Sequence, residues 1–291
     1  MSDYQELMGT IQSRYPNFQT WRIIVSGSVG SGKSVAAASF PTPENKIRMV
    51  LDFEDSMAFI DAGEDGDEVY SPRKQRFAMR RLIYPTLNQI AEVQNELSDG
   101  KIGVLVLDNI AIFQDNIVLA LQTFCDQPKT IRDLFRSFGA SSSLPFDSQI
   151  KRWANQKDPS FWNAAKAIPK ALIMEAMKNK VHILGTSEEA NIWKNYGTAD
   201  ARVIGKRAKI WDVFFRYFDA VIMLQRDINS TNPPWGQLNP IQPKLRLQGF
   251  NPKWQMDWAG FSDELAASLE REEPKIPEEL QIKVEEMFEE A

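Results

Sequence analysis

Five short hydrophobic runs recur along the chain, and each is apolar at consecutive positions instead of alternate ones. Strands that are apolar on both faces are typical of the centre of a parallel sheet that helices cover on both sides. The runs are RIIVSG at 22–27, IRMVLDF at 47–53, GVLVLDN at 103–109, VHILGTS at 181–187 and DAVIMLQR at 219–226. They predict five central strands.

Helical stretches separate these runs and are long enough to join parallel strands. We expect helices at 33–40, at about 82–98, at 115–137 and at 164–179. Alternating strands and helices predict an α/β fold in which a mostly parallel central sheet carries helices on both faces.

The chain has no internal repeat, no low-complexity block and no linker that would separate two equal domains. After residue 230 the pattern changes, and Pro, Asn and Trp become frequent. The expected segments are an N-terminal extension at 1–20, the α/β core at 21–230, an irregular strand-and-turn extension at 231–269 and an acidic tail at 270–291.

Charge is concentrated in the tail. The whole chain has a net charge of −5, but the last 22 residues hold nine acidic and three basic residues, so the rest carries about +1. Net charge therefore argues neither for nor against binding to nucleic acid. The tail is either a solvated acidic end or an arm that binds a partner protein or mimics DNA.

The amino-acid composition excludes several kinds of functional site. The 291 residues are 43% hydrophobic and 25% charged, as in ordinary globular proteins. The single cysteine, Cys125, and the single histidine, His182, exclude an internal disulfide and a zinc site of the usual kind. His182 lies inside the run VHILGT, so we expect a strand residue. With no signal segment or long apolar span, we expect a cytoplasmic protein without a membrane partner.

One motif points to chemistry. Residues 27–34, GSVGSGKS, fit the phosphate-binding loop G-x-x-x-x-G-K-[ST], and they stand between a predicted strand and a predicted helix. Glycines let the backbone N–H groups wrap around a polyphosphate, Lys33 supplies charge to the β and γ phosphates, and Ser34 offers a hydroxyl to Mg²⁺. The alternative is a plain glycine turn with an exposed lysine. The predicted ATP-binding residues are Gly27, Ser28, Val29, Gly30, Ser31, Gly32, Lys33, Ser34 and Val35.

Asp108 ends the third run, about 75 residues after the loop, as a Walker B aspartate does. We expect it to orient Mg²⁺ through its water shell, with Ser34 as the other metal group. The alternative is an aspartate that caps the start of the next helix.

Hydrolysis also needs a group that polarises the attacking water. Asn109 follows the Walker B aspartate, where many ATPases carry a glutamate, so the candidate base must lie elsewhere. Glu54 follows the second run, at the sheet edge where parallel α/β proteins bind ligands. A solvated loop carboxylate is the alternative, and Asp52 and Asp55 are close enough in sequence to be confused with it.

The succession of the phosphate loop, VLDFEDS, VLVLDN and ILGTSEE resembles the core of RecA-like ATPases over about residues 20–226. It is similar in particular to compact RecA-like proteins encoded by bacteriophages, some of which act in recombination by single-strand annealing. The resemblance implies Glu54 as the water-activating carboxylate, Asp108 on the Mg²⁺ shell, and Thr186, Ser187 and Glu188 as sensors of the γ phosphate. Neither the glutamine-type sensor loop nor the DNA-binding loop of RecA itself is matched, so the resemblance implies ATP more directly than DNA.

Two regions could contact DNA. Residues 71–81 place five basic side chains around Phe77, and residues 141–166 combine Lys151 and Arg152 with Trp153 and Trp162. Basic and aromatic side chains together are typical of single-strand binding. The alternatives are pairing of the first region with the acidic loop before it, and packing of the second region's aromatics onto the core.

A third basic group lies just ahead of the last core strand, at Lys206, Arg207 and Lys209. The resemblance implies that a basic residue of this part reaches the γ phosphate of a neighbouring subunit, and therefore a head-to-tail ring or filament. The alternative is a solvated basic face.

The function that these observations favour is an Mg²⁺-dependent ATPase that acts on DNA in recombination, repair or replication. Single-stranded DNA is the favoured partner, and the host cytoplasm is the expected location if a phage encodes the protein. A nucleotide-gated assembly protein without DNA binding is the second hypothesis. A small-molecule phosphotransferase is the third, although no acceptor-binding signature is evident.

Overall fold

A computed structural model of the chain describes the following residues: 3–57, 68–70, 76–194, 197, 201–211, 214, 216–226, 235–238, 254, 255, 258 and 261–263. The helices are α1 (Asp3–Arg14), α2 (Lys33–Ala38), α3 (Leu87–Glu96), α4 (Ile110–Thr123), α5 (Pro128–Ser137), α6 (Asp147–Ile150) and α7 (Pro159–Lys178). The strands are β1 (Arg22–Gly27), β2 (Ile47–Asp52), β3 (Glu68–Tyr70), β4 (Arg76–Ile83), β5 (Ile102–Asp108), β6 (His182–Ser187), β7 (Glu189–Lys194), β8 (Arg202–Ala208), β9 (Ala220–Gln225), β10 (Trp235–Leu238) and β11 (Trp254–Gln255).

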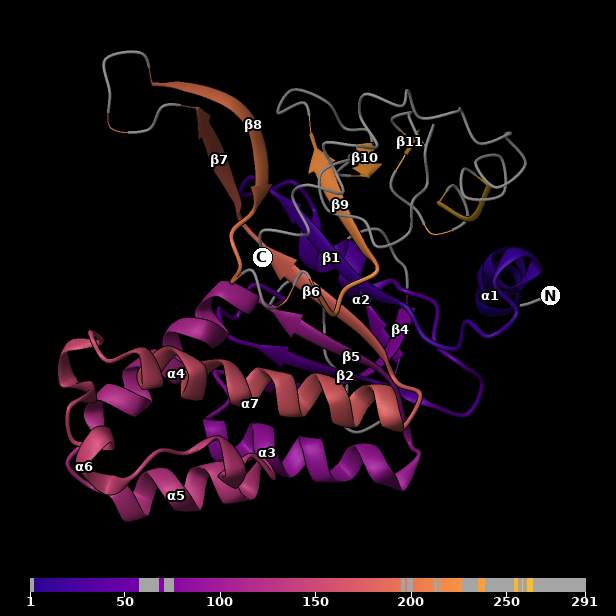
Figure 1. Cartoon of the computed structure of the whole chain (residues 1–291). Coiled ribbons are helices and arrows are strands. Elements are labelled where there is room, and N and C mark those ends of the chain that lie inside the picture. The colour runs from indigo at the N-terminus through magenta and orange to yellow at the C-terminus, as the bar shows by residue number, and fades with distance from the viewer. Residues whose placement is uncertain are drawn as a thin grey trace.

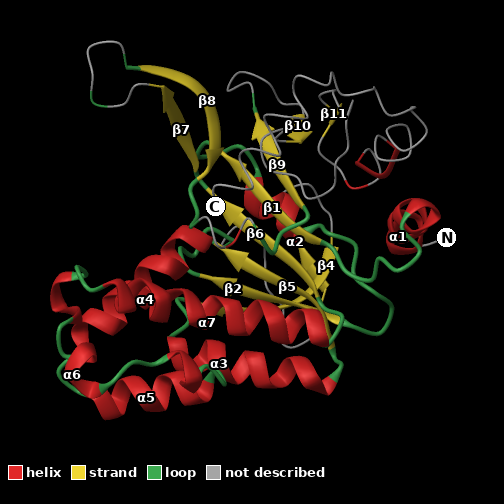
Figure 2. Cartoon of the chain, viewed as in Figure 1, coloured by secondary structure: helices red, strands yellow, loops and turns green. Residues whose placement is uncertain are grey.

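One sheet dominates the structure, in the order β11-β10-β9-β1-β6-β5-β2-β4-β3 (Figures 1 and 2). The strands from β9 to β4 in this order run parallel, whereas β10, β11 and β3 pair antiparallel at the two ends. The predicted α/β fold with a mostly parallel sheet is confirmed. All five predicted strands form, each within a residue of its expected ends.

Helices cover both faces of the sheet, as predicted. On one face α3, α4, α5 and α7 pack in a layer below the sheet in Figure 1, over side chains such as Ile24 and Leu105. On the other face α1 and α2 pack over Ile23, Val25 and the other inward residues of the second cluster. Neighbouring residues of β1 thus point to opposite cores, which is why the run is apolar at consecutive positions.

Two helix predictions were wrong. The helix expected at 82–98 begins only at Leu87, because residues 82 and 83 complete β4, and Thr86 then caps the helix with Gln89 in a capping box. The helix expected at 115–137 is two helices, α4 and α5, because α4 ends at Thr123 and Pro128 opens α5. Proline lacks the backbone N–H that a continuing helix needs, but it is well tolerated at a first helical position.

β4 is the parallel strand that the sequence pattern did not reveal. Charged residues interrupt its apolar positions, since Arg80 and Arg81 follow Met79. Arg81 is nevertheless largely buried and lies beside Asp52 and Asp55. Of the β4 residues whose burial is described, Met79 is buried and Ile83 is exposed, so this strand lacks the consecutive apolar burial of the central strands.

The N-terminal segment contributes to the core, since Leu7, Met8 and Ile11 of α1 are buried in the second cluster. His182 is buried at the start of β6, as predicted, and its ring contacts α1 through Tyr4. No helix of the described residues is both long and apolar enough to cross a membrane.

β7 and β8 form a separate two-stranded antiparallel sheet. This hairpin extends away from the body beyond the carboxyl ends of β6 and β5 (Figure 1). It carries the predicted basic residues Lys206 and Arg207 on β8, opposite Asn191 and Ala190 of β7.

Candidate functional site

The carboxyl ends of four neighbouring parallel strands place the predicted site residues at one edge of the sheet. The phosphate loop follows β1, Glu54 follows β2, Asp108 ends β5, and Thr186 and Ser187 end β6. Because β2, β5, β6 and β1 are adjacent in the sheet, residues from distant parts of the sequence, from Gly27 to Ser187, meet here.

The phosphate loop has the backbone shape that its glycines allow. Gly30 and Gly32 have φ angles of 75° and 91°, in the left-handed region that side chains disfavour. Gly27 has no room for a side chain, because a Cβ there would lie 2.6 Å from Ser31 Oγ and 2.7 Å from the carbonyl oxygen of Leu224. The Ser31 hydroxyl is buried and has no hydrogen-bond partner among the described residues, so a donor remains available inside the loop.

Lys33, the first residue of α2, folds back over this loop. Its ammonium donates to the carbonyl oxygens of Gly27 at 3.1 Å and Ser28 at 2.9 Å. Burial lowers the pKa of Lys33, and nearby carboxylates oppose that shift. These carboxylates are Asp108, Glu188, Glu54 and Glu189. The ammonium thus sits in an acidic setting, held by two weak neutral acceptors that a phosphate oxygen could replace.

Asp108 is buried and accepts hydrogen bonds with both of its oxygens. Thr186 Oγ1 donates to Oδ1, and Ser56 Oγ donates to Oδ2. Ser34 Oγ lies 3.1 Å from Ser56 Oγ, so Ser56 links the two predicted metal groups, Ser34 and Asp108. These oxygens are the hard ligand type that Mg²⁺ prefers, and the donor set therefore fits that ion.

The helix-capping alternative for Asp108 is wrong. Asn109 is the N-cap of α4, and its Oδ1 accepts from the backbone N–H of Ala111 at 2.8 Å. The peptide bond between Asp108 and Asn109 is cis.

Glu54 differs from the two aspartates beside it. Its carboxylate is exposed and accepts from Asn109 Nδ2 at 3.4 Å. Asp52 is fully buried and faces Arg81 at 3.8 Å, whereas Asp55 pairs with the same arginine at 3.1 Å. Glu54 is therefore the carboxylate of the three that does not pair with Arg81, and it lies at the edge of the phosphate loop, near enough to Lys33 for its charge to oppose the lowering of that ammonium's pKa by burial.

The predicted sensor residues take different directions. Thr186 bonds to Asp108 and belongs to the cluster, and Ser187 donates to the carbonyl oxygens of Glu188 and Lys209. The Glu188 carboxylate pairs with the Lys209 ammonium at 3.3 Å. Of the three, Thr186 alone bonds through its side chain to Asp108, the predicted magnesium residue.

Sequence reasoning missed three residues at this edge. Ser56 and Arg81 are described above, and Arg226 donates from Nη1 to the carbonyl oxygen of Gly30 at 3.3 Å. Arg226 directly follows β9, which pairs with β1, so the strand order alone would have placed it next to the loop. No local motif identifies Ser56 or Arg81, because their partners lie 22 to 52 residues away.

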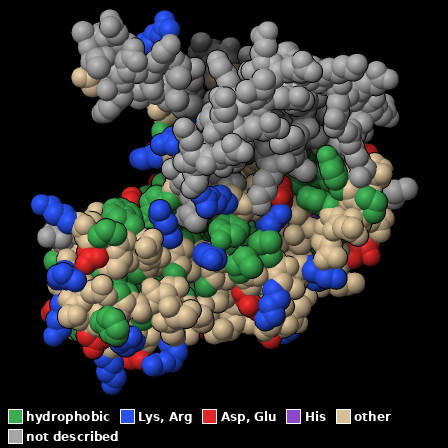
Figure 3. All heavy atoms as spheres, viewed as in Figure 1, with side chains coloured by type: hydrophobic (Ala, Val, Ile, Leu, Met, Phe, Trp, Pro, Cys, Tyr) green, Lys and Arg blue, Asp and Glu red, His purple; other side chains and the backbone are tan. Residues whose placement is uncertain are grey.

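Several residues of the two predicted DNA-contacting regions form ion pairs or pack within the protein itself. Arg80 pairs with Glu96 at 2.6 Å, Arg81 pairs as described, and residues 71–75 lie outside the described part. Trp153 is fully buried and donates to Ser160 Oγ at 3.0 Å, so the packing alternative holds for this ring. Trp162 packs edge-on against Phe161. Lys and Arg side chains are spread over the described face in Figure 3, with Asp and Glu between them.

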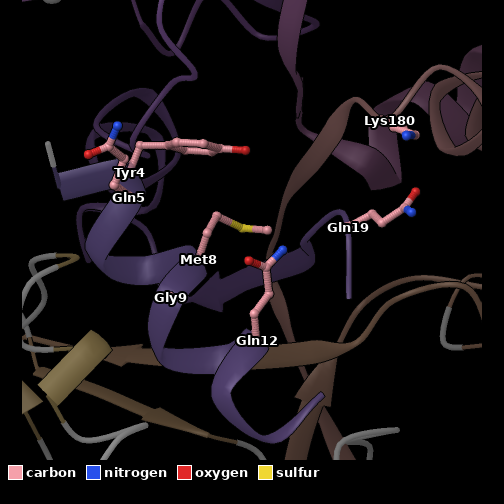
Figure 4. Close-up of a pocket in the computed structure, with 7 residues that line it drawn as sticks. All are labelled: Tyr4, Gln5, Met8, Gly9, Gln12, Gln19 and Lys180. Atoms are coloured by element: carbon pink, nitrogen blue, oxygen red, sulfur yellow. The ribbon is translucent and has the colours of Figure 1, made fainter. Parts of the chain in front are cut away.

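A shallow pocket of about 400 Å³ lies at the other edge of the sheet. Its lining comes from α1 and from the segments that precede β1 and β6 (Figure 4). The residues are Tyr4, Gln5, Met8, Gly9, Gln12, Gln19 and Lys180. The amino ends of the parallel strands lie here, so the pocket is separate from the phosphate loop.

No protein-family model matches the chain, and no curated protein matches it in sequence. Among solved structures, the crystal structure of the RadB recombinase is similar with a TM-score of 0.41 and 9% sequence identity. The match covers 86% of this chain and 94% of that chain. The fold assignment rests on the strand order and the two helical layers described above.

Proposed function

We propose that the protein is an Mg²⁺-dependent, ATP-hydrolysing P-loop protein of the RecA-like class that acts on DNA, with single strands favoured. One observation carries this proposal. The phosphate loop, Asp108 and Glu54 lie together at the carboxyl edge of the sheet, where a triphosphate, a metal and an attacking water would all be needed.

Nucleotide binding would use the loop and Lys33. The backbone N–H groups of residues 29–34 would surround a polyphosphate, and the Lys33 ammonium would exchange the carbonyl oxygens of Gly27 and Ser28 for phosphate oxygens. Bound magnesium would neutralise charge on the β and γ phosphates. Ser34 and Asp108 are the residues that would hold it.

Hydrolysis would use Glu54. Its exposed carboxylate would accept a hydrogen bond from the attacking water and then take the proton from that water. Asn109 would keep the carboxylate oriented. Thr186 fixes Asp108 from the buried side. Transition-state charge would be offset in trans, by Lys206 or Arg207 on the projecting hairpin of the next subunit in a ring or filament. DNA is proposed as the partner because the order of the sequence motifs resembles that of RecA-like ATPases.

A second function is supported by a different observation. Trp153 is buried, and Arg80 and Arg81 form ion pairs, so these members of the predicted DNA surfaces are engaged internally. A nucleotide-gated assembly protein would need no such surface. In that case ATP would change the oligomeric state, while DNA would change neither binding nor turnover.

A hydrolysis assay tests the proposal. Purified protein is compared without DNA, with single strands and with duplex, for the wild type, Lys33→Ala and Glu54→Gln. We expect stimulation by single strands, loss of nucleotide binding in Lys33→Ala, and retained binding with a loss of turnover of 100-fold or more in Glu54→Gln, roughly the contribution of a general base. Sedimentation with and without ATP, beside DNA gel shifts at several salt concentrations, identifies the assembly protein. Unchanged turnover in Glu54→Gln would remove that residue from the mechanism.

A further inference from the structure

Ser56 lies between the two groups that are predicted to hold magnesium. Its Oγ is 3.1 Å from Ser34 Oγ, at the start of α2, and it donates a hydrogen bond to Asp108 Oδ2, at the end of β5. We propose that Ser56 is a third protein group of the magnesium site. The inference rests on the proposed function, because it concerns the metal that accompanies the nucleotide.

The position of Ser56 is built into the backbone. The buried carboxylate of Asp52 accepts three backbone N–H groups of the following turn, from Glu54 at 3.3 Å, Ser56 at 3.1 Å and Met57 at 3.0 Å. The Met57 side chain is fully buried and anchors the end of this turn in the second core cluster. Asp52 therefore holds the turn, and the Ser56 hydroxyl is not needed to do so.

The hydrogen-bond pattern leaves the lone pairs of Ser56 Oγ directed toward the predicted metal position. A serine hydroxyl has one proton and two lone pairs, and the Ser56 hydroxyl donates its proton in the hydrogen bond to Asp108. Its lone pairs then face the Ser34 hydroxyl, which is the other predicted metal group. A hard cation attracts such oxygen lone pairs, and Mg²⁺ completes its six positions with waters and phosphate oxygens.

A purely structural role for Ser56 makes a different prediction. If the hydroxyl only positioned Asp108, its loss would also raise the magnesium requirement, because Asp108 is itself a predicted metal group, but a thiol in its place would not bind Cd²⁺. If the hydroxyl is itself a metal ligand, its loss would weaken binding only when magnesium is present, and a thiol in its place would shift the preference to Cd²⁺.

The test measures binding of a fluorescent ATP analogue to the full chain over a magnesium titration and in EDTA. For Ser56→Ala we expect nucleotide affinity equal to the wild type in EDTA and a magnesium requirement raised about tenfold, in the range that residues supporting a metal site contribute. Ser56→Thr keeps the hydroxyl and should stay within threefold of the wild type. Ser39→Ala is the matched control, because it removes from the end of α2 a hydroxyl that, among the described residues, bonds only to the carbonyl oxygen of Ala36.

The variant Ser56→Cys gives a second readout, which distinguishes a metal ligand from a group that only positions Asp108. Ser56→Cys should lose magnesium-supported binding as Ser56→Ala does, but should regain it with Cd²⁺, because a soft sulfur ligand prefers a soft cation. Cys125 is buried, and the wild type, which also carries it, gives the background Cd²⁺ response.

The outcomes are separable. Equal losses with magnesium and in EDTA, no loss at all in Ser56→Ala, or no recovery of Ser56→Cys with Cd²⁺ would overturn the role of Ser56 while the wild type still binds magnesium and nucleotide. Wild-type protein that takes up no nucleotide would overturn the proposed function, and this inference with it.

Discussion

His182 offers a direct test of the energetics, because it is the single histidine of the chain. Its ring is enclosed between α1, β1 and β6. Nδ1 accepts from the backbone N–H of Trp21 at 2.9 Å, so the neutral ring carries its proton on Nε2, which faces the Tyr4 hydroxyl at 3.1 Å. Phe40 lies against the ring, with centroids 5.5 Å apart.

Burial lowers the pKa of His182 from 6.5 to about 4, and the charge of Lys46 adds to this. Because the folded pKa lies below the unfolded one, the unfolded chain binds a proton first as the pH falls. The neutral ring's contribution is therefore fully present above pH 6.5 and is lost as the pH drops towards 4. The difference between the two pKa values corresponds to about 3 kcal/mol in full, of which about 2 kcal/mol is lost by pH 5.

The perturbation is His182→Asn, whose side-chain oxygen can accept from the Trp21 N–H without titrating. Urea unfolding is measured for both proteins at several pH values between 7.5 and 4.5. We expect the variant to be less stable at pH 7.5, because it leaves a small cavity, but the wild type should lose about 2 kcal/mol more than the variant by pH 5. The imidazole signals of labelled protein report the pKa independently. Stability curves that stay parallel, or a ring that titrates near 6.5, would refute the reasoning.

Two further predictions concern side-chain packing in the core. Gly185→Ala should destabilise the fold by about 1–3 kcal/mol, since its Cβ would lie 2.1 Å from Ile110 Cδ1, and Ile110→Val should restore part of the loss in thermal unfolding. A neutral effect of Gly185→Ala would show that the core can yield there. Trp153→Phe removes a hydrogen bond to Ser160 and buried ring area, so it should cost about 1–3 kcal/mol while affinity for single-stranded DNA stays unchanged. Weaker DNA binding by a Trp153→Phe variant of wild-type stability would instead show that this ring contributes to DNA binding.

Local pattern predicted the central sheet well, for a physical reason. A strand buried on both faces must be apolar at consecutive positions, and the runs at β1, β2, β5, β6 and β9 met that requirement. The phosphate loop was equally visible, because a backbone that cradles phosphate needs glycines at fixed spacing. Where an ion pair replaced apolar contacts, as at Arg81 on β4, the same pattern failed.

The chain sequence by itself thus determined the fold class, the phosphate loop and the carboxylates to be weighed. The tertiary structure alone decided which of three neighbouring carboxylates does not pair with Arg81, and which hydroxyl joins Ser34 to Asp108. The order of parallel strands brings these groups to one edge from distant parts of the chain. Contacts of that kind depend on strand order and on burial, and neither is encoded in the spacing of neighbouring residues.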